Sequence, residues 1–483
     1  MIPTKRTKIV CTIGPASRDP ETLEKMVAAG MNVARLNFSH GTHEEHAALI
    51  KMLRELALKT GEPIAILQDL QGPKIRVGDL PKEGVMLVKD EIAVFSTEPG
   101  AALPKIAVTY DKLHEDVKAG DIILLDDGLL EVKVEKIEGR DIVTKVVNGG
   151  PLTSHKGFNL PTATLSIPAI TEKDRADVKF GVSQHVDWVA LSFVRNAKEI
   201  YDLRYLIKDY ERELGIEHKY EHPIRIVAKI EKHEAVRNID EIIEAVDGIM
   251  VARGDLGIET PAEEVPLVQK RIIDKCLHAA KPVIVATQML DSMMRNPRPT
   301  RAEVSDVANA VIDHTDAVML SGESASGKYP VVSVETMARI VRETEASKYD
   351  DLKTEHEKCI ACQTIEVSVS EAATVLAKDV GAKLVLVASM SGDTGRVISR
   401  YRPELPVLVA TDNERVRHQL NLSWGVIPFI LPRCRTVEEL VDRSVGHLKK
   451  EKMVKTGDKI IVIAGEPVGQ SGGVNLVEIS EIK

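Results

Sequence analysis

The sequence predicts an α/β protein built on an eight-stranded (β/α)₈ TIM barrel, with an inserted small β-barrel-like domain and a C-terminal α/β domain. Short apolar runs alternate with amphipathic helical stretches eight times, which is typical of βα units in a parallel sheet. The alternation is interrupted once by a stretch without helical period, and it resumes after a polar linker. The predicted barrel comprises residues 1–72 and 169–346, the insertion residues 73–168, and the C-terminal domain residues 347–483.

Eight apolar runs are the predicted barrel strands, and N-cap signals mark helix starts between them. Asp19 stands ahead of Pro20, while Thr42 and Thr171 are each followed three positions later by an acidic residue, the spacing of a capping box. In such a barrel the active site lies at the carboxyl ends of the strands. The strands are Lys8–Ile13, Met31–Phe38, Pro63–Leu70, Val186–Val194, Pro223–Ile230, Asp247–Ala252, Pro282–Thr287 and Asp316–Leu320.

The insertion and the C-terminal domain have different patterns. From about Pro73 to Pro168, short alternating runs separated by Gly and Asp predict a small β domain placed in a βα loop at the catalytic face. After the polar stretch from Ser347 to Lys358, renewed α/β alternation predicts a mostly parallel sheet. The runs in the insertion include Val85–Val88, Ile122–Leu125, Glu131–Val134 and Ile142–Val146, and those in the C-terminal domain are Lys383–Ser389, Pro406–Ala410, Val426–Leu431, Lys459–Ala464 and Val474–Ile479.

Composition excludes several classes of protein. A net charge of -9 argues against nucleic acid as the main partner, because a phosphate backbone binds basic surfaces. No apolar run approaches the ~20 residues of a membrane span, and the N-terminus lacks a signal-like apolar region, so we expect a cytoplasmic protein without a membrane partner. The five cysteines are too scattered for a disulfide framework. Cys359 and Cys362 form a CxxC without the second pair that zinc prefers, so we expect ordinary thiols.

Two neighbouring apolar runs end on charged residues, at Lys229 and Glu231 in one and at Asp255 in the other. Charged groups are unfavourable in a core, so their delivery to one region indicates a site. Because side chains alternate along a strand, Lys229 and Glu231 share one face. Carboxylates bind hard divalent ions and a lysine supplies a mobile positive charge, a combination that suits phosphoryl transfer.

Polar residues also end the other predicted strands. Any one of them is as easily a satisfied polar group that closes a strand. The whole set is better explained by a site, because chance would not concentrate basic residues and carboxylates on one rim. The further rim residues are Arg35, Asn37, Ser39, Asp69, Lys74, Arg76, Ser192, Arg195, Arg253, Thr287, Gln288, Ser321 and Glu323.

Six segments carry a resemblance to a known family: CTIGPAS (11–17), ARLNFSHG (34–41), KIEKHEAVRN (229–238), DGIMVARGDLGIE (247–259), ATQML (286–290) and the run from NPRPTRAEV to SGKYP (296–330). They closely resemble pyruvate kinase, and the similarity extends over essentially the whole chain. The resemblance implies that phosphoenolpyruvate donates its phosphoryl group to ADP, giving ATP, and that the remaining enolate is protonated to pyruvate. It also implies a homotetramer.

The resemblance assigns roles to the residues at the strand ends. Glu231 and Asp255 match the ligands of Mg²⁺ or Mn²⁺, and Lys229 matches the lysine on the transferring phosphoryl group. Arg35 matches a second phosphate clamp, and Thr287 matches the hydroxyl that passes a proton to the methylene carbon through water.

Further contacts are implied for the substrate carboxylate and the nucleotide. The backbone of Gly254 and Asp255 is expected to contact the carboxylate, because a helix N-terminus favours an anion. The inserted domain is expected to close as a lid over the phosphates and exclude water. The implied nucleotide contacts are Asn37, His40, Arg76 and Lys156.

Lys74 is the clear departure from the commoner family pattern. After Asp69 many members read Thr-Lys-Gly-Pro-Glu, where polar residues enclose a K⁺ ion, but this chain reads Leu-Gln-Gly-Pro-Lys. A K⁺ held ~5 Å from the Lys74 ammonium would be repelled by roughly 3 kcal/mol at an effective dielectric of ~20. We therefore expect the ammonium to replace K⁺, with Asn37, Ser39 and Asp69 as its surroundings.

A loop in the C-terminal domain resembles the family's sugar-phosphate effector loop. It follows a predicted strand and opens a helix, so its amides and hydroxyls could hold a phosphorylated allosteric effector, although a plain strand-to-helix turn explains it nearly as well. Asp393 is an unwelcome charge there, and the segment Gly465–Gly473 could face the loop. The candidate effector residues are Ser389, Ser391, Thr394, Gly395 and Arg396.

Two other functions remain open at this point. A metal-dependent barrel lyase or aldolase that acts on a keto-acid enolate would also need a Glu and an Asp on Mg²⁺, but it gives no reason for Lys156. A catalytically idle metabolite sensor would not require Lys229, Glu231, Asp255 and Thr287 together.

Overall fold

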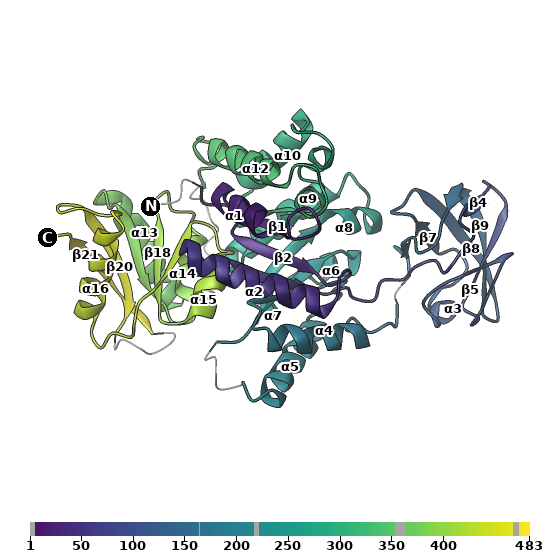
Figure 1. Cartoon of the computed structure of the whole chain (residues 1–483), viewed down its shortest axis with the longest axis horizontal. Helices are drawn as coiled ribbons and strands as arrows, with labels where there is room; N and C mark the ends of the chain where they lie inside the picture. Colours follow the sequence, from purple (N-terminus) through teal and green to yellow (C-terminus); the bar gives the residue numbers. More distant parts are fainter. Residues whose placement is uncertain (1–4, 164, 217–221, 353–363, 467–472) are drawn as a thin grey trace.

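The computed structural model describes residues 5–163, 165–216, 222–352, 364–466 and 473–483. Its centre is a closed parallel barrel of eight strands, in the order β1-β2-β3-β12-β13-β14-β15-β16 (Figure 1). Each predicted barrel strand is confirmed. The strands are β1 (Lys8–Thr12), β2 (Val33–Asn37), β3 (Ala65–Asp69), β12 (Trp188–Leu191), β13 (Arg225–Ile230), β14 (Gly248–Ala252), β15 (Val283–Ala286) and β16 (Ala317–Leu320).

Helices surround the barrel, and an aliphatic core lies between them and the strands. The predicted N-caps are confirmed, because Asp19 accepts the Thr22 amide and both Thr42 and Thr171 form complete capping boxes. The helices are α1 (Pro20–Ala29), α2 (His43–Thr60), α4 (Glu172–Ser183), α5 (Ala197–Glu213), α6 (His233–Arg237), α7 (Ile239–Ala245), α8 (Arg253–Glu259), α9 (Val265–His278), the 3₁₀ helix η1 (Asp291–Met294), α10 (Arg301–Ile312), α11 (Gly322–Ala325) and α12 (Pro330–Glu345).

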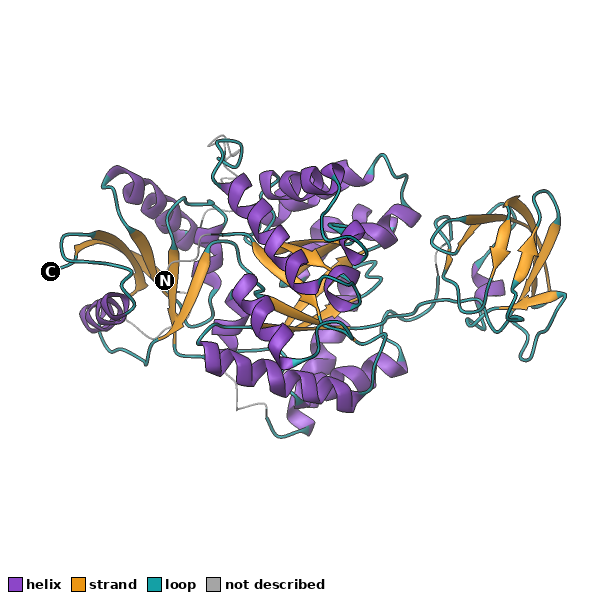
Figure 2. Ribbon diagram, turned by 45° about the horizontal axis from the view of Figure 1, so that its top comes forward, coloured by secondary structure: helices purple, strands orange, loops and turns teal. Residues whose placement is uncertain are grey.

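The insertion follows β3 and forms a β domain with its own apolar core around Phe95 and Phe158. Its sheet has the order β11-β7-β8-β9-β5-β6, and β10 pairs separately with β4. The domain stands beyond one end of the barrel, joined to it by two extended connections (Figures 1 and 2). Its elements are β4 (Val85–Leu87), β5 (Ile92–Ser96), β6 (Lys105–Ala107), α3 (Leu113–Asp116), β7 (Ile122–Leu125), β8 (Leu130–Glu138), β9 (Asp141–Asn148), β10 (Gly150–Leu152) and β11 (Phe158–Asn159).

The C-terminal domain contains a five-stranded sheet in the order β19-β18-β17-β20-β21. The sheet is parallel except for β21, which runs antiparallel to β20, so the expected mostly parallel sheet is confirmed. The cysteines of the CxxC, Cys359 and Cys362, lie outside the described residues. The elements are α13 (Ile365–Asp379), β17 (Leu384–Ala388), α14 (Asp393–Ser399), β18 (Val407–Thr411), α15 (Glu414–Leu420), β19 (Val426–Ile430), α16 (Val437–Lys450), β20 (Lys459–Gly465) and β21 (Val474–Glu481).

The C-terminal domain is joined to the barrel by more than a linker, because α15 and the residues after it close the amino end of the barrel. Leu422 is fully buried in the same apolar cluster as Trp188 and the other inward-facing strand residues. Gln419 Nε2 donates to the Asp187 carbonyl at 3.1 Å, and Lys8 Nζ donates to a carbonyl of β19 at 2.7 Å. The two domains therefore share one core at this end.

No helix in the described part of the chain is both long enough and apolar enough to cross a lipid bilayer.

Candidate active site

Lys229 and Glu231, at the carboxyl end of β13, form the centre of a buried charged cluster. Lys229 Nζ lies 2.8 Å from Glu231 Oε1 and 3.3 Å from Asp69 Oδ1. It also donates to Ser192 Oγ at 2.7 Å. The Lys229 side chain is 12% exposed and that of Glu231 is 1% exposed. The alternation along β13 therefore places both residues on the inner face, as the sequence predicts.

The surroundings of Lys229 keep its ammonium charged. Burial alone would lower the pKa of Lys229, but the carboxylates of Asp69 and then Glu231 outweigh burial and raise that pKa above its ordinary value. For Glu231, burial raises the pKa of the carboxyl; Lys229 opposes the rise and Asp255 adds to it. The strand end thus holds a permanent cation beside a carboxyl group that is poorly solvated.

Asp69, at the end of β3, orients two cations. Its Oδ2 atom accepts Arg35 Nε at 2.6 Å, while its Oδ1 atom faces Lys229. Burial favours the neutral acid, but the charges of Lys229 and Arg35 together hold the pKa of Asp69 below its usual value. A further donation from Arg35 to Thr12 Oγ1, at 2.8 Å, fixes the guanidinium. Residues from β1, β2, β3 and β13 therefore meet at one point.

The donor set fits a hard divalent cation. Glu231 Oε2 accepts the Phe193 amide at 2.6 Å, whereas the buried Oε1 atom, although close to Lys229, has no partner in hydrogen-bond geometry among the described residues. Asp255, in the first turn of α8, is half-buried and acts electrostatically on Glu231. Within the described ranges no three His, Cys, Asp or Glu side chains converge. Two carboxylates, completed by water and substrate oxygens, are a usual set for Mg²⁺.

Thr287 follows β15 in a strained backbone conformation. Its φ is 74°, and that of Gln288 is 55°, values in the left-handed region that are uncommon for non-glycine residues. Thr287 Oγ1 accepts the Gly254 amide at 2.7 Å and donates to the Ala286 carbonyl at 2.6 Å. Arg253 fixes the Thr287 carbonyl with a hydrogen bond of 2.8 Å. The Gly254 amide, predicted to contact a substrate carboxylate, is thus engaged by Thr287 in this structure.

The residues predicted to contact a nucleotide fall into two groups. Asn37 ends β2 and its Oδ1 atom accepts the Ser39 amide at 3.1 Å, while His40 is exposed in the loop that follows. Arg76 and Lys156 lie together in the insertion. The first group therefore belongs to the barrel and the second to the insertion, which stand apart in Figure 2.

Within the insertion, two antiparallel segments bring the predicted cations together. Arg76 bridges to Gly157, and its side chain donates to the His155 carbonyl at 3.0 Å. Lys156 Nζ lies 2.7 Å from Asp126 Oδ1, and this hydrogen bond raises the pKa of Lys156.

Lys74 is half-buried where the chain leaves the barrel for the insertion. Among the described residues its ammonium forms no ion pair, and the two oxygens of Asp69 face Arg35 and Lys229 instead. Asn37 and Ser39 contact each other through the hydrogen bond given above.

Two groups in the site were not predicted from the sequence, and one predicted rim residue has a structural role. Thr12 was overlooked, although a polar residue that ends the first strand was a usable signal. The Phe193 amide has no signal in the side-chain pattern. Glu323 is a satisfied polar group, since its buried carboxylate accepts the amides of Leu290 at 2.9 Å and Ser321 at 2.8 Å.

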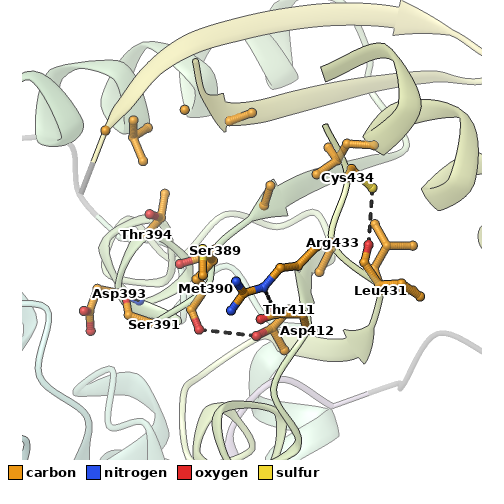
Figure 3. A pocket seen from close by; sticks show the side chains of 18 of the residues that line it. Ser389, Met390, Ser391, Asp393, Thr394, Thr411, Asp412, Leu431, Arg433 and Cys434 are labelled. Atoms are coloured by element: carbon orange, nitrogen blue, oxygen red, sulfur yellow. Dashed lines mark hydrogen bonds and ion pairs between the residues drawn. The ribbon is translucent and has the colours of Figure 1, made fainter. Parts of the chain in front are cut away.

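A second concave site lies in the C-terminal domain, where the loops after β17, β18 and β19 surround a cavity of about 160 Å³ (Figure 3). Of the candidate effector residues, Ser389, Ser391 and Thr394 line the cavity, whereas Gly395 and Arg396 are not among the residues that line it. Gly465 and Gly473, the ends of the segment expected to face the loop, also line it, whereas residues 467–472 between them lie outside the described part of the chain.

The charge of Asp393 is neutralised by two guanidinium groups. Asp393 Oδ1 lies 2.8 Å from Arg396 NH1 and 2.9 Å from Arg225 NH2, at the start of β13. Burial opposes ionisation, but Arg396 and then Arg225 lower the pKa of Asp393 to about 2. Thr394 Oγ1 donates to Glu366 at 2.8 Å, and Arg433 Nε donates to Asp412 at 2.5 Å (Figure 3).

Comparison with known proteins gives a consistent result along the chain. A family model described as "Pyruvate kinase, barrel domain" matches residues 4–334, and one described as "Pyruvate kinase, alpha/beta domain" matches residues 367–480. A pyruvate kinase of Geobacillus stearothermophilus is 48% identical over 99% of this chain and 80% of that protein. One of Clostridium acetobutylicum is 43% identical over 99% of this chain and 100% of that protein. A crystal structure of a pyruvate kinase from Cryptosporidium parvum superposes with a TM-score of 0.90 at 35% identity, covering 99% and 97% of the two chains.

Proposed function

Because the chain belongs to the pyruvate kinase family, we propose that the cluster at the end of β13 performs the chemistry of that family. The enzyme is a glycolytic phosphotransferase (EC 2.7.1.40) that transfers the phosphoryl group of phosphoenolpyruvate to ADP, giving pyruvate and ATP. The observation that carries the site proposal is the Lys229 ammonium, held between Asp69 and Glu231. A coupled assay of ATP formation from phosphoenolpyruvate and ADP tests the activity, since a barrel lyase forms no ATP.

Lys229 acts on the phosphoryl group during transfer. Negative charge spreads over the phosphoryl oxygens in the transition state, so a fixed cation there lowers the barrier directly. Three partners, Asp69, Ser192 and Glu231, already hold the ammonium in place, so little reorganisation is needed when charge develops.

Glu231 and Asp255 would hold the divalent cation. A bound Mg²⁺ or Mn²⁺ supplies positive charge that neutralises the oxygens of the phosphate and the enolate. The buried Oε1 atom of Glu231 supports this role, because its partner among the described residues is the Lys229 ammonium at 2.8 Å, and a carboxylate oxygen has a further lone pair that can bind a metal ion.

Arg35, Gly254 and Thr287 position the substrate in this proposal. Arg35 binds the phosphate beside Lys229, and the amides of Gly254 and Asp255 receive the carboxylate. When the carboxylate takes the Gly254 amide, Thr287 Oγ1 loses its present donor and becomes available to a water near the methylene carbon. The hydrogen bond between the Gly254 amide and Thr287 Oγ1 supports this arrangement, because it places the hydroxyl beside the amide that is proposed to bind the carboxylate.

The insertion acts as a lid that carries nucleotide contacts. We assign residues 73–168 to it, residues 1–72 and 169–346 to the barrel, and residues 347–483 to the C-terminal domain. Closure would bring Arg76 and Lys156 over a nucleotide bound near Asn37 and His40 and would exclude water from the phosphates.

Replacement of Lys156 by Ala tests the lid. The KM for ADP should rise by about tenfold or more, with divalent-ion affinity unchanged, because the lost cation faces the nucleotide phosphates and not the metal. Lys145→Ala is the matched control, since Lys145 forms an exposed ion pair with Asp90 at 3.0 Å in the same domain. Equal kinetics of the two variants with ADP would show Lys156 to be an ordinary surface charge.

The Lys74 ammonium takes the place of K⁺ in this chain, so the enzyme needs Mg²⁺ or Mn²⁺ but no monovalent cation. The supporting observation is the charge change at this position. In this structure Asp69 pairs with Arg35 and Lys229. When substrate binds these two cations, Asn37, Ser39 and Asp69 would form the polar surroundings of the Lys74 ammonium.

The cavity of the C-terminal domain binds a phosphorylated effector, and the active form is a homotetramer. The hydroxyls of Ser389 and Ser391 and the guanidinium of Arg433 support the first proposal, because they line the cavity and offer donors to a phosphate. Activity assays across a panel of phosphorylated metabolites should identify an activator whose effect is lost in Ser391→Ala. Light scattering on the purified protein tests the oligomeric state.

A further inference from the structure

Both connections of the insertion meet one buried carboxylate, Asp174, in the first turn of α4. Its Oδ2 atom accepts the amide and the hydroxyl of Thr171, at 2.9 and 2.6 Å, where the chain returns from the insertion. Its Oδ1 atom accepts the amide of Gly72, at 3.1 Å, where the chain departs. A capping box requires only the contacts with Thr171. The bond to Gly72 goes beyond capping and ties the two connections together.

Arg195 holds the returning connection at a second point. Its NH2 atom donates to the Ile167 carbonyl at 2.9 Å, and its NH1 atom donates to the Leu165 carbonyl. Glu199 orients the guanidinium, since its Oε1 atom accepts Arg195 Nε at 2.8 Å. The Arg195 side chain is 19% exposed and that of Glu199 is 10% exposed. Arg195 therefore binds the backbone of the returning connection, whereas Lys229 occupies the centre of the barrel end.

The segment Ser192–Arg195, between β12 and α5, contacts the connections on one side and the catalytic pair on the other. Ser192 Oγ accepts Lys229 Nζ, and the Phe193 amide donates to Glu231. Gly72 packs against the same segment so closely that an added Cβ would lie 2.9 Å from Ser192 Cβ. The same short segment therefore contacts both connections and the groups that orient Lys229 and Glu231.

We propose that Asp174 and Arg195 are positioning residues that anchor both connections of the insertion to the segment Ser192–Arg195, so that closure of the insertion places Lys156 in a fixed relation to Lys229 and Glu231. Two anchored connections restrict the insertion to a hinge motion. Loss of an anchor enlarges the set of open orientations, and closure over the nucleotide then requires more ordering. This inference rests on the proposed lid function.

The test uses two conservative variants of the full-length enzyme. Asp174→Asn keeps the size of the side chain but presents an amide donor where an oxygen now accepts, and Arg195→Lys keeps a charge for Glu199 but cannot reach two carbonyls. Both should raise the KM for ADP by about tenfold, whereas the KM for phosphoenolpyruvate and the affinity for Mn²⁺ should stay within about twofold.

Asp187→Asn is the matched control at the opposite end of the barrel. Asp187 is also buried and also accepts a β3 amide, that of Ile66 at 2.7 Å, while it pairs with Arg54 at 2.9 Å. It does not contact the connections. This variant should lower the melting temperature at least as much as Asp174→Asn and leave the KM for ADP unchanged.

Combination with Lys156→Ala separates the inference from the lid proposal. If Asp174 acts by placing Lys156, the two substitutions should not add. The KM for ADP of the double variant Asp174→Asn/Lys156→Ala should then lie within about twofold of that of the more impaired single variant. The inference is overturned if Lys156→Ala raises the KM for ADP but neither Asp174→Asn nor Arg195→Lys does. It is also overturned if the two anchor variants impair all kinetic constants in proportion to their loss of stability. If Lys156→Ala itself has no effect, the lid proposal fails as well.

Discussion

Strands β13 and β14 carry charged residues at both ends, and the two ends differ in how those charges are satisfied. At the amino ends, Arg225 lies between Asp247 at 3.5 Å and Asp393 at 2.9 Å. Asp247 also accepts the Ile226 amide at 2.9 Å and pairs with Arg204 at 3.0 Å. These groups hold strand starts together and attach the C-terminal domain.

At the carboxyl ends the charged groups gather around one lysine inside the barrel. Lys229 pairs with Asp69 at 3.3 Å and with Glu231 at 2.8 Å. A left-handed backbone such as that of Thr287 does not mark this end, because Ala280 and His314, beside strand starts, have it too. The contrast indicates that buried charge alone does not identify a site in a barrel, since the charges at the amino ends join two domains. Loss of charge at the carboxyl ends should therefore impair the reaction, and loss of charge at the amino ends should impair folding.

Lys229→Met should lower phosphoryl transfer by about a thousandfold or more, equivalent to roughly 4 kcal/mol, because the cation acts on charge that develops in the transition state. Metal-assisted proton exchange at the methyl group of pyruvate should be largely retained. Single-turnover transfer and proton exchange followed by NMR measure the two steps. Equal loss of both in a variant that still binds Mn²⁺ would contradict the assignment.

Glu231→Gln should weaken Mn²⁺ binding by about a hundredfold, because a neutral amide replaces a carboxylate ligand. Only the ionised acid binds a cation, and burial raises its pKa. Wild-type affinity should therefore fall as the pH decreases through that raised pKa, at a higher pH than for an exposed glutamate, and the variant should lose this dependence. Titration calorimetry across pH measures both effects, and identical pH profiles would count against Glu231 as ligand.

Lys74→Glu should reduce activity and regain part of it on addition of K⁺, because the substitution changes the local charge by two units and restores a site for a cation. The wild type should be fully active with Mg²⁺ when a bulky tetraalkylammonium is the monovalent cation. Initial rates with and without K⁺ provide the measurement. Activation of the wild type by tenfold or more would refute the replacement of K⁺ by Lys74.

Arg225→Ala should destabilise the fold by about 1–2 kcal/mol and leave kcat within about twofold, because the satisfied charges at the amino ends serve stability. Denaturant unfolding and a saturating activity assay give the two quantities. A tenfold loss of kcat in a fully folded variant would show that the amino ends also serve the reaction.

Asp350 is an exception at the amino end, a buried carboxylate 3.8 Å from His314. Burial and then the charge of Glu345 raise its pKa to about 7. The folded state therefore holds a proton that the unfolded chain releases near pH ~4, so stability from this group declines between those values as the pH rises. Asp350→Asn should melt a few degrees higher than wild type at pH 8 and equally at pH 4, as followed by circular dichroism.

The features that the sequence predicted correctly are local. Apolar runs with N-caps such as Thr42 and Thr171 gave the barrel, and strand alternation placed Lys229 and Glu231 together. The pairing of Asp69 with two cations could not be read in the same way, because it joins β2, β3 and β13, which are distant in the sequence. Several strands of the insertion, such as β6, are too short to show a period.

The packing of the C-terminal domain on the barrel was not predicted from the sequence. The polar stretch indicated only where a new domain begins, whereas Leu422 lies in the barrel core. Nothing in the local pattern shows that a single apolar residue after a short helix packs against strands that are more than 100 positions earlier in the sequence.

The position of Leu422 limits how this chain can be recombined. A chimaera that joins this barrel to the C-terminal half of a relative replaces Leu422, which fills the amino end of the barrel, and the amide donors of Gln419 and Asn421 with the relative's residues. A crossover in the linker therefore separates two sides of one core. Productive exchange would have to transplant the segment from α15 to Trp424 with the barrel, although it belongs to the other half of the gene.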